Sequence, residues 1–176
     1  MSGALSDIQL TELAKKLKFN LNGIYFADEI KSEDLRPGNY IINTSPKFDA
    51  SGNQNPGTHW VCTIITKRDG KVWIQYMDPF GQPPSENLKK FVDKKWRRRI
   101  NYTTKDIQSL MDSVCGWYCC AYLHYIHQIP NRTKDVLYDT AIWLNFFVDL
   151  ETDTNYKKIF LFLSFCFRSR VRHSKD

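Results

Sequence analysis

Long apolar runs are missing from this chain. The longest strongly hydrophobic stretch of the 176 residues is the segment 159–167, whereas a membrane-spanning helix needs about 20 such residues. Residues 1–18 also lack the apolar stretch behind a basic start that marks a secretory signal. We therefore expect a protein that is intracellular or enclosed in a virion and has no membrane partner.

Cysteine is sparse as well. The chain has 5 cysteines, an odd number, and two of them, Cys119 and Cys120, are adjacent. Such a set makes a poor disulfide framework and suits a reducing compartment. The hydrophobic fraction of 42% and the aromatic fraction of 14% argue against disorder, because they supply the apolar surface that a core needs. We expect one domain, residues 1–176, that is a monomer.

Acidic residues are outnumbered, and the net charge is +6. The excess lies in two clusters rather than along the whole chain, which makes a polyanion such as DNA a candidate partner. A basic face that is only solvated is an equally good interpretation of a charge run. The candidate DNA contacts are Lys94, Lys95, Arg97, Arg98 and Arg99, and a second cluster at the end of the chain contains Arg168, Arg170, Arg172, His173 and Lys175.

Caps, breakers and hydrophobic spacing predict an α+β fold, with a small central antiparallel sheet flanked by helices. Ser6 with Gln9 has the form of a capping box, and Ser85 is a second helix cap. A hairpin is expected across the polar turn 67–71. The other expected helices cover 115–129, about 133–150 and 155–168, and the expected strands cover 23–26, 39–44, 60–66, 72–78 and about 99–103.

Four residues with complementary chemistry follow one another between residues 57 and 120. His59 lies in GTHW, Asp78 in MDPFG, and Cys115 opens CGWYCC, with Gln108 seven residues ahead of it. A thiol with a pKa of about 8.5 is mostly protonated at neutral pH, so a nucleophilic cysteine needs a base. A neutral imidazole can take the proton, and a carboxylate on the far ring nitrogen fixes its tautomer.

The expected elements bring these groups within reach of one another. His59 precedes one strand of the hairpin and Asp78 ends the other, so the two lie at the same end of an antiparallel pair. Cys115 begins a buried helix, whose N-terminus favours a thiolate and can hold an oxyanion. The backbone N–H of Cys115 and the side chain of Gln108 are the candidate oxyanion donors. Gly116 lets another segment approach this helix closely.

Each residue also has an ordinary structural interpretation. A strand-end histidine is often satisfied by the backbone, an aspartate before proline often caps a turn, and a glutamine is usually exposed. The four settings together, in this order, favour catalytic roles for His59, Asp78 and Gln108. Trp60 is left open between core packing and a wall beside His59.

The helix that begins at Cys115 carries a rival chemistry. Cys120, His124 and His127 fall on one helical face and are zinc-ligand types. Structural zinc sites gather paired ligands from more than one segment, so no metal site is expected. Cys119 and Cys120 are expected to be small core residues rather than nucleophiles.

These motifs resemble those of one family, the adenovirus maturation endopeptidase (adenain) and the related cysteine proteases of virophages and Maverick-type elements. The resemblance lies in GTHW, DPFG, the glutamine seven places before the nucleophile, and CGWYCC followed by YLH. It covers residues 57–129, with weaker similarity in the first helix and in GIYFADEI at 23–30.

The resemblance implies a papain-like fold in permuted chain order and a thiol protease of the virion and the infected host cell. Its substrates would be viral capsid and other virion precursor proteins, cleaved after Gly-X-Gly or Gly-Gly motifs. The implied roles are His59 as base and acid, Asp78 as the residue that orients it, Cys115 as nucleophile and Gln108 as oxyanion donor. The adenoviral acid is glutamate, whereas related ubiquitin-like deconjugating proteases use aspartate.

The resemblance also concerns cofactors. The adenoviral enzyme uses DNA and a viral peptide that is disulfide-linked to a cysteine between the acid and the nucleophile, but residues 79–114 contain no cysteine. The sequence itself requires no cofactor, and DNA or a non-covalent activating viral peptide remains open. Two alternative functions are a ubiquitin-like-protein deconjugating protease and a catalytically inactive, nucleic-acid-binding virion protein of the same fold.

Overall fold

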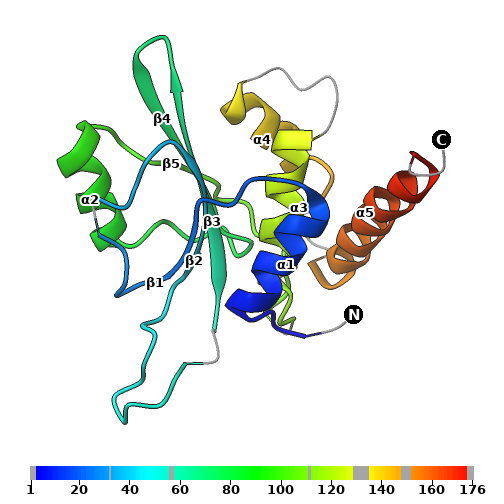
Figure 1. The fold of residues 1–176 in the computed structure, drawn as a ribbon, viewed down its shortest axis with the longest axis horizontal. Coiled ribbons are helices and arrows are strands. Elements are labelled where there is room, and N and C mark those ends of the chain that lie inside the picture. The colour runs from blue at the N-terminus through cyan, green and yellow to red at the C-terminus, as the bar shows by residue number, and fades with distance from the viewer. Residues whose placement is uncertain are drawn as a thin grey trace.

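The computed structural model of the chain describes residues 3–31, 33–55, 58–110, 112–128, 135–147 and 152–173. Within these ranges the chain forms an α+β fold of five helices and five strands (Figure 1). The elements are, in chain order, α1 (Asp7–Leu17), β1 (Gly23–Phe26), β2 (Gly38–Asn43), β3 (Trp60–Arg68), β4 (Lys71–Met77), α2 (Glu86–Trp96), β5 (Asn101–Tyr102), α3 (Cys115–Gln128), α4 (Val136–Leu144) and α5 (Thr152–His173).

The sheet is mixed, which corrects the expectation of an antiparallel one. Its strand order is β1-β2-β3-β4-β5. The central strands β2, β3 and β4 are antiparallel, whereas both edge strands, β1 and β5, run parallel to their neighbours. Helix α2 lies between β4 and β5 in the chain and supplies the crossover that parallel neighbours need. Strand direction depends on such connections, and hydrophobic alternation does not encode it.

The expected hairpin is present and has a tighter turn than expected. Strand β3 runs to Arg68 and β4 begins at Lys71, so only Asp69 and Gly70 connect them. Both have positive φ, 50° and 73°, as the central residues of a two-residue hairpin turn require. The paired strands therefore separate this turn from the open end of the hairpin, where β3 begins and β4 ends.

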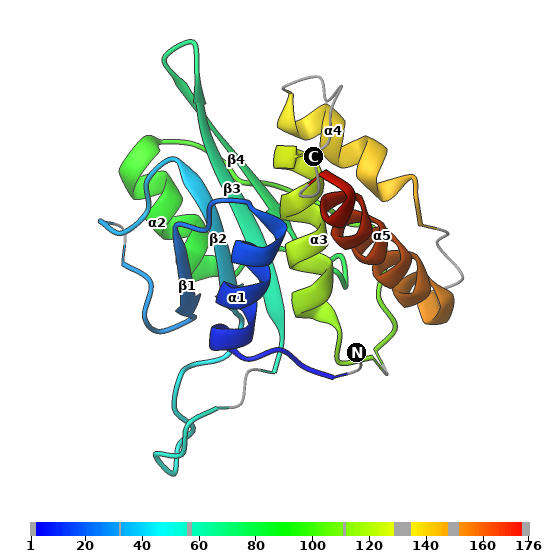
Figure 2. The same ribbon diagram turned by 45° about the vertical axis from the view of Figure 1, so that its right-hand side comes forward.

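Helices cover both faces of the sheet. Helix α2 packs on one face, over a core that includes Leu88 and Val92, while α1 and α3 pack on the other. Figure 2 shows α4 and α5 on the side of α3 that faces away from the sheet. Helix α3 is therefore enclosed by its neighbours, and Tyr118, Tyr122 and Leu123 are completely buried in it. The expectation of a buried central helix is confirmed.

The helix caps agree with the sequence, and two helix lengths do not. Ser6 and Gln9 form the capping box of α1, and Ser85 accepts from the N–H of Leu88 at the start of α2. Helix α4 begins only after Asp135, whose side chain accepts from the N–H groups of the first turn. Helix α5 begins at Thr152 and extends to His173, beyond the expected 155–168. Residues 133–134 and 148–150 of the expected helix 133–150 lie outside the described residues. The same holds for residue 129, the last of the expected helix 115–129.

None of the helices in the described ranges combines the length and the apolar character needed to cross a bilayer. Helix α5 has 22 residues but carries charged side chains along its length, among them Lys157 and Lys158.

Candidate active site

His59 and Asp78 meet at one end of the β3–β4 hairpin. His59 directly precedes β3 and Asp78 directly follows β4, and the strands pair in antiparallel register with Cys62 opposite Met77. The Nε2 atom of His59 lies 2.8 Å from Oδ1 of Asp78. The expected meeting of imidazole and carboxylate is therefore confirmed.

The Asp78 carboxylate is held by the turn that follows it. Its Oδ1 also accepts from the N–H of Phe80 at 2.8 Å, and the Gly81 N–H donates to the Asp78 carbonyl at 2.9 Å. Gly81 has φ +66°, and a Cβ there would lie 2.7 Å from the carbonyl oxygen of Thr104. Only glycine fits this position without strain. Asp78, which is 2% exposed, thus caps a turn and binds the imidazole with the same oxygen.

The His59 ring is stacked on Phe80, with centroids 4.4 Å apart and planes at 20°. Nδ1, the ring nitrogen that Asp78 does not use, has no nitrogen or oxygen partner in the described part of the chain. Burial by itself lowers the pKa of His59, but the hydrogen bond to Asp78 and the interaction with the Cys115 sulfur raise it to about 9. The ring is therefore poised to be an imidazolium between a carboxylate and a sulfur atom.

Cys115 is the first residue of α3 and is 4% exposed. Its Sγ accepts from the backbone N–H of Trp60 at 3.3 Å. Because Trp60 follows His59, this contact places the sulfur beside the residue that carries the base. The first N–H groups of a helix have no partner within it, so the start of α3 offers donors and a partial positive charge. Both can stabilise negative charge that develops at this end of the helix.

Gly116 provides the close approach that was expected of it. A Cβ at this residue would lie 3.0 Å from Cδ2 of Leu10 and 3.3 Å from Cβ of Leu5. The N-terminal segment therefore lies directly against the first turn of α3.

Gln108 is buried, at 1% exposure. The alternative interpretation, that it is an exposed residue, is therefore wrong. Its backbone N–H donates to the carbonyl of Pro79 at 3.1 Å, and its Nε2 donates to the carbonyl of Asp112. It thus connects the residue after Asp78 with the segment that leads into Cys115. A side-chain amide has two N–H donors, so one remains beyond the bond to Asp112.

The remaining buried thiols are core residues. Cys62, Cys119 and Cys120 are fully buried. Burial raises the pKa of Cys119 and of Cys120 well above the ordinary value of a thiol, which makes both poor nucleophiles. The expectation that Cys119 and Cys120 pack in the core is confirmed. Trp60 is also completely buried, and its side chain packs in the core.

The Cys120, His124 and His127 set does not gather into a metal site. His124 Nδ1 lies 2.9 Å from the carbonyl oxygen of Leu17, and His127 Nε2 lies 2.7 Å from Oδ1 of Asn39. Among the described residues, no group of three histidine, cysteine, aspartate or glutamate side chains is placed to hold a metal ion.

The arginines of the predicted basic cluster lie beside the turn end of the β3–β4 hairpin, away from His59. All five candidate DNA contacts, Lys94, Lys95, Arg97, Arg98 and Arg99, are exposed. The three arginines line a hollow of about 390 Å³ together with Lys71 and Trp73.

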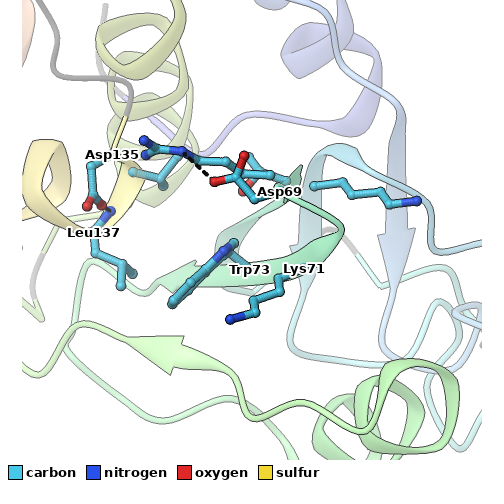
Figure 3. Close-up of a pocket in the computed structure, with 9 residues that line it drawn as sticks. Asp69, Lys71, Trp73, Asp135 and Leu137 are labelled. Atoms are coloured by element: carbon cyan, nitrogen blue, oxygen red, sulfur yellow. Dashed lines mark hydrogen bonds and ion pairs between the residues drawn. The ribbon is translucent and has the colours of Figure 1, made fainter.

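A second hollow, of about 630 Å³, shares Lys71 and Trp73. Figure 3 shows Asp69, Lys71 and Trp73 of the hairpin beside Asp135 and Leu137 at the start of α4. Lys67 and Arg68 also line this hollow. Neither these hairpin cations nor Trp73 was predicted as a functional residue from the sequence. Trp73 is 44% exposed, which alternation within a strand would have suggested.

No known protein-family model matches this chain, and no characterised protein sequence matches it.

Proposed function

We propose that this protein is a cysteine endopeptidase of the adenain kind, which cleaves viral capsid and other virion precursor proteins after Gly-X-Gly or Gly-Gly motifs. The observation that carries the proposal is the convergence of three side chains from distant segments. His59 is 2.8 Å from Asp78, and the residue after His59 donates to the sulfur of Cys115. Stacking on Phe80 and the bond to Asp78 fix the orientation of the imidazole, and the Cys115 sulfur is close enough to raise its pKa.

The chemistry follows from these contacts. His59 takes the thiol proton of Cys115, and the resulting thiolate attacks the scissile carbonyl carbon. Negative charge moves to the carbonyl oxygen, where the N–H of Cys115 and the second N–H of Gln108 are the proposed donors. The imidazolium then protonates the leaving amine as the C–N bond breaks. Water, deprotonated by His59, hydrolyses the thioester and restores the thiol.

A papain-like fold in permuted order is part of the proposal. The base precedes the hairpin, the acid follows it, and the nucleophile begins the helix that packs on the sheet. This arrangement supports the proposed fold because the active groups then lie between a sheet end and a helix N-terminus. The virion and the infected host cell are the proposed location, with the virion precursors as partners.

The wild-type protein and Cys115→Ala are the matched pair that tests the proposal. Each is incubated with a virion precursor fusion that contains a Gly-X-Gly site, and the products are mapped by mass spectrometry. We expect cleavage at the glycine motif by the wild type only. Cleavage that persists in Cys115→Ala, or none by the wild type with and without DNA, would reject the endopeptidase.

Asp78 favours a second candidate, a protease for ubiquitin-like conjugates, because those enzymes use aspartate as the acid. A ubiquitin-like fusion that ends in Gly-Gly, added to the same assay, separates the two. A higher kcat/KM for this fusion than for the virion precursor would replace the first proposal with the second.

The basic hollows favour DNA as a partner, and we propose that it binds over Arg97, Arg98, Arg99 and Trp73. Guanidinium groups neutralise phosphates, and an exposed indole offers a stacking face to a base. If Cys115 proves no more reactive than the core thiols while DNA still binds, the alternative is an inactive nucleic-acid-binding virion protein. Addition of DNA to the cleavage assay tests directly whether DNA stimulates the enzyme. Activation by a non-covalent viral peptide also remains a proposal.

A further inference from the structure

Residues 3–5, named here the N-terminal clamp, lie against the beginning of the helix that carries Cys115. The carbonyl of Leu5 accepts from the indole Nε1 of Trp60 at 2.7 Å, and the carbonyl of Gly3 accepts from the indole Nε1 of Trp117 at 3.3 Å. The Leu5 side chain covers Gly116, where a Cβ would lie within 3.4 Å of it. The clamp therefore contacts both β3 and α3.

Trp60 connects the clamp to the nucleophile. Its backbone N–H donates to Sγ of Cys115 at 3.3 Å, and its carbonyl accepts from Sγ of Cys119 at 3.4 Å. Its indole N–H is taken by Leu5, and its ring packs on Phe26 with centroids 5.6 Å apart. All three polar groups of this fully buried residue are thus bonded, which leaves its backbone little freedom to move relative to the sulfur.

We propose that the N-terminal clamp is a positioning element that sets the placement of Cys115 relative to His59, an inference that rests on the proposed endopeptidase function. The contact that joins the two segments, from the Trp60 N–H to the Cys115 sulfur, spans 55 residues of chain, so no local chain geometry fixes the separation of His59 and Cys115. A segment that holds both β3 and α3 supplies that constraint. A displacement of about 1 Å can cost about 10²-fold in rate.

Two features distinguish the clamp from ordinary core packing. Each tryptophan that the clamp binds lies close in sequence to one member of the catalytic pair, since Trp60 follows His59 and Trp117 lies two residues after Cys115. The clamp is also anchored at its C-terminal end, where the N–H of Ser6 donates to Oε1 of Gln9 in the capping box of α1. A change in the clamp therefore transmits to both sides of the pair.

The test uses Trp60→Phe, which keeps an aromatic ring but leaves the buried Leu5 carbonyl without its donor, and a chain that lacks residues 1–5. Leu5→Ala removes the cover of Gly116 and serves if the shortened chain does not fold. Leu17→Ala is the control, because Leu17 is fully buried in α1 and belongs to neither the clamp nor the catalytic pair. It weakens the core without touching the clamp contacts.

Two readouts are measured for each protein. The first is the rate at which iodoacetamide alkylates Cys115 across pH 6 to 10, located by peptide mapping, and the second is kcat and KM on a Gly-X-Gly peptide. We expect the clamp variants to lose about tenfold in kcat with little change in KM. We also expect Cys115 to be alkylated more slowly at neutral pH in the clamp variants, because His59 is then less well placed to take the thiol proton, while Leu17→Ala keeps the wild-type profile.

The outcomes separate the clamp from the endopeptidase proposal. Clamp variants that retain the wild-type alkylation profile and kcat overturn the inference, as does an equal loss in Leu17→Ala. If the alkylation profile of Cys115 changes in the clamp variants but the wild type cleaves no glycine-motif substrate, the positioning role of the clamp is supported and the endopeptidase function is rejected. Recovery of the shortened chain on addition of a peptide of residues 1–6 supports the inference further.

Discussion

The ring of Phe80 lies flat against the imidazole of His59, with the planes at 20° and the centroids 4.4 Å apart. Phe80 also donates its N–H to the carboxylate oxygen of Asp78 that binds His59. Phe80 thus covers the imidazole of His59 and holds the carboxylate of Asp78 at the same time. This double contact gives the DPFG turn a physical role in the candidate site.

Phe80→Ala is expected to lower kcat about tenfold, because the uncovered imidazole gains freedom and its bond to Asp78 becomes accessible to water. The backbone N–H to Asp78 is retained, so the acid itself stays in place. Phe80→Tyr keeps the stacked ring and should remain near the wild-type rate. Steady-state kinetics of the two variants test this, and equal rates for Phe80→Ala and the wild type would contradict it.

Cys115→Ala should abolish peptide cleavage while leaving the fold intact. The side chain that is lost is small, and the core around it is formed by residues such as Trp60 and Tyr118. Turnover and the midpoint of thermal unfolding are measured side by side. Cys120→Ala is the matched control, since it removes a fully buried thiol from the same helix and should leave cleavage measurable.

The raised pKa of His59 predicts a pH dependence with a definite sign. Because the folded-state pKa is about 9 and the ordinary value is 6.5, the imidazolium contributes stability that is fully present below pH 6.5. That contribution is lost as pH rises toward and through 9. A shift of this size corresponds to at most roughly 3 to 4 kcal/mol in the free energy of unfolding.

Denaturant unfolding of the wild type and His59→Gln at pH 6 and pH 9.5 tests the stability prediction. The wild type should lose more stability than the variant between these values. Cleavage should fall on the alkaline side near pH 9, and Asp78→Asn should move this fall to lower pH because the carboxylate raises the pKa of His59. A pH-independent difference between wild type and His59→Gln would refute the assignment.

Gln108→Ala should cost about 10² to 10³ in kcat with KM nearly unchanged, as expected for an oxyanion donor that acts mainly in the transition state. The side chain also donates to Asp112, so thermal unfolding is measured in parallel. A rate near that of the wild type in a folded variant would remove Gln108 from the mechanism.

Arg98→Ala should weaken DNA binding and reduce the slope of log affinity against log salt by about 1. Lys16→Ala is the control, because it removes one exposed cation from α1, on the other face of the sheet from α2. Fluorescence anisotropy with a labelled oligonucleotide at several salt concentrations measures both. Identical slopes for the two variants would show that binding is not centred on the arginine cluster.

The sequence predicted the meeting of His59 and Asp78 better than it predicted the strand directions of the sheet. His59 and Asp78 belong to one hairpin, so local alternation and a polar turn were enough to bring them together. The parallel edge strands were not foreseen, because their direction depends on the path of the chain outside the strands. Gln108 shows the same limit, since composition favours exposure and only its contacts with Pro79 and Asp112 account for its burial.

The sequence by itself determined the features that a few neighbouring residues encode. These are the Ser6 capping box, the hairpin, the buried character of α3, and the presence of an imidazole, a carboxylate and a thiol in suitable settings. The tertiary structure alone decided that the Trp60 N–H meets the Cys115 sulfur and that Leu5 holds Trp60 in place. Those contacts join segments 55 residues apart, and packing between elements, rather than any local periodicity, sets such distances.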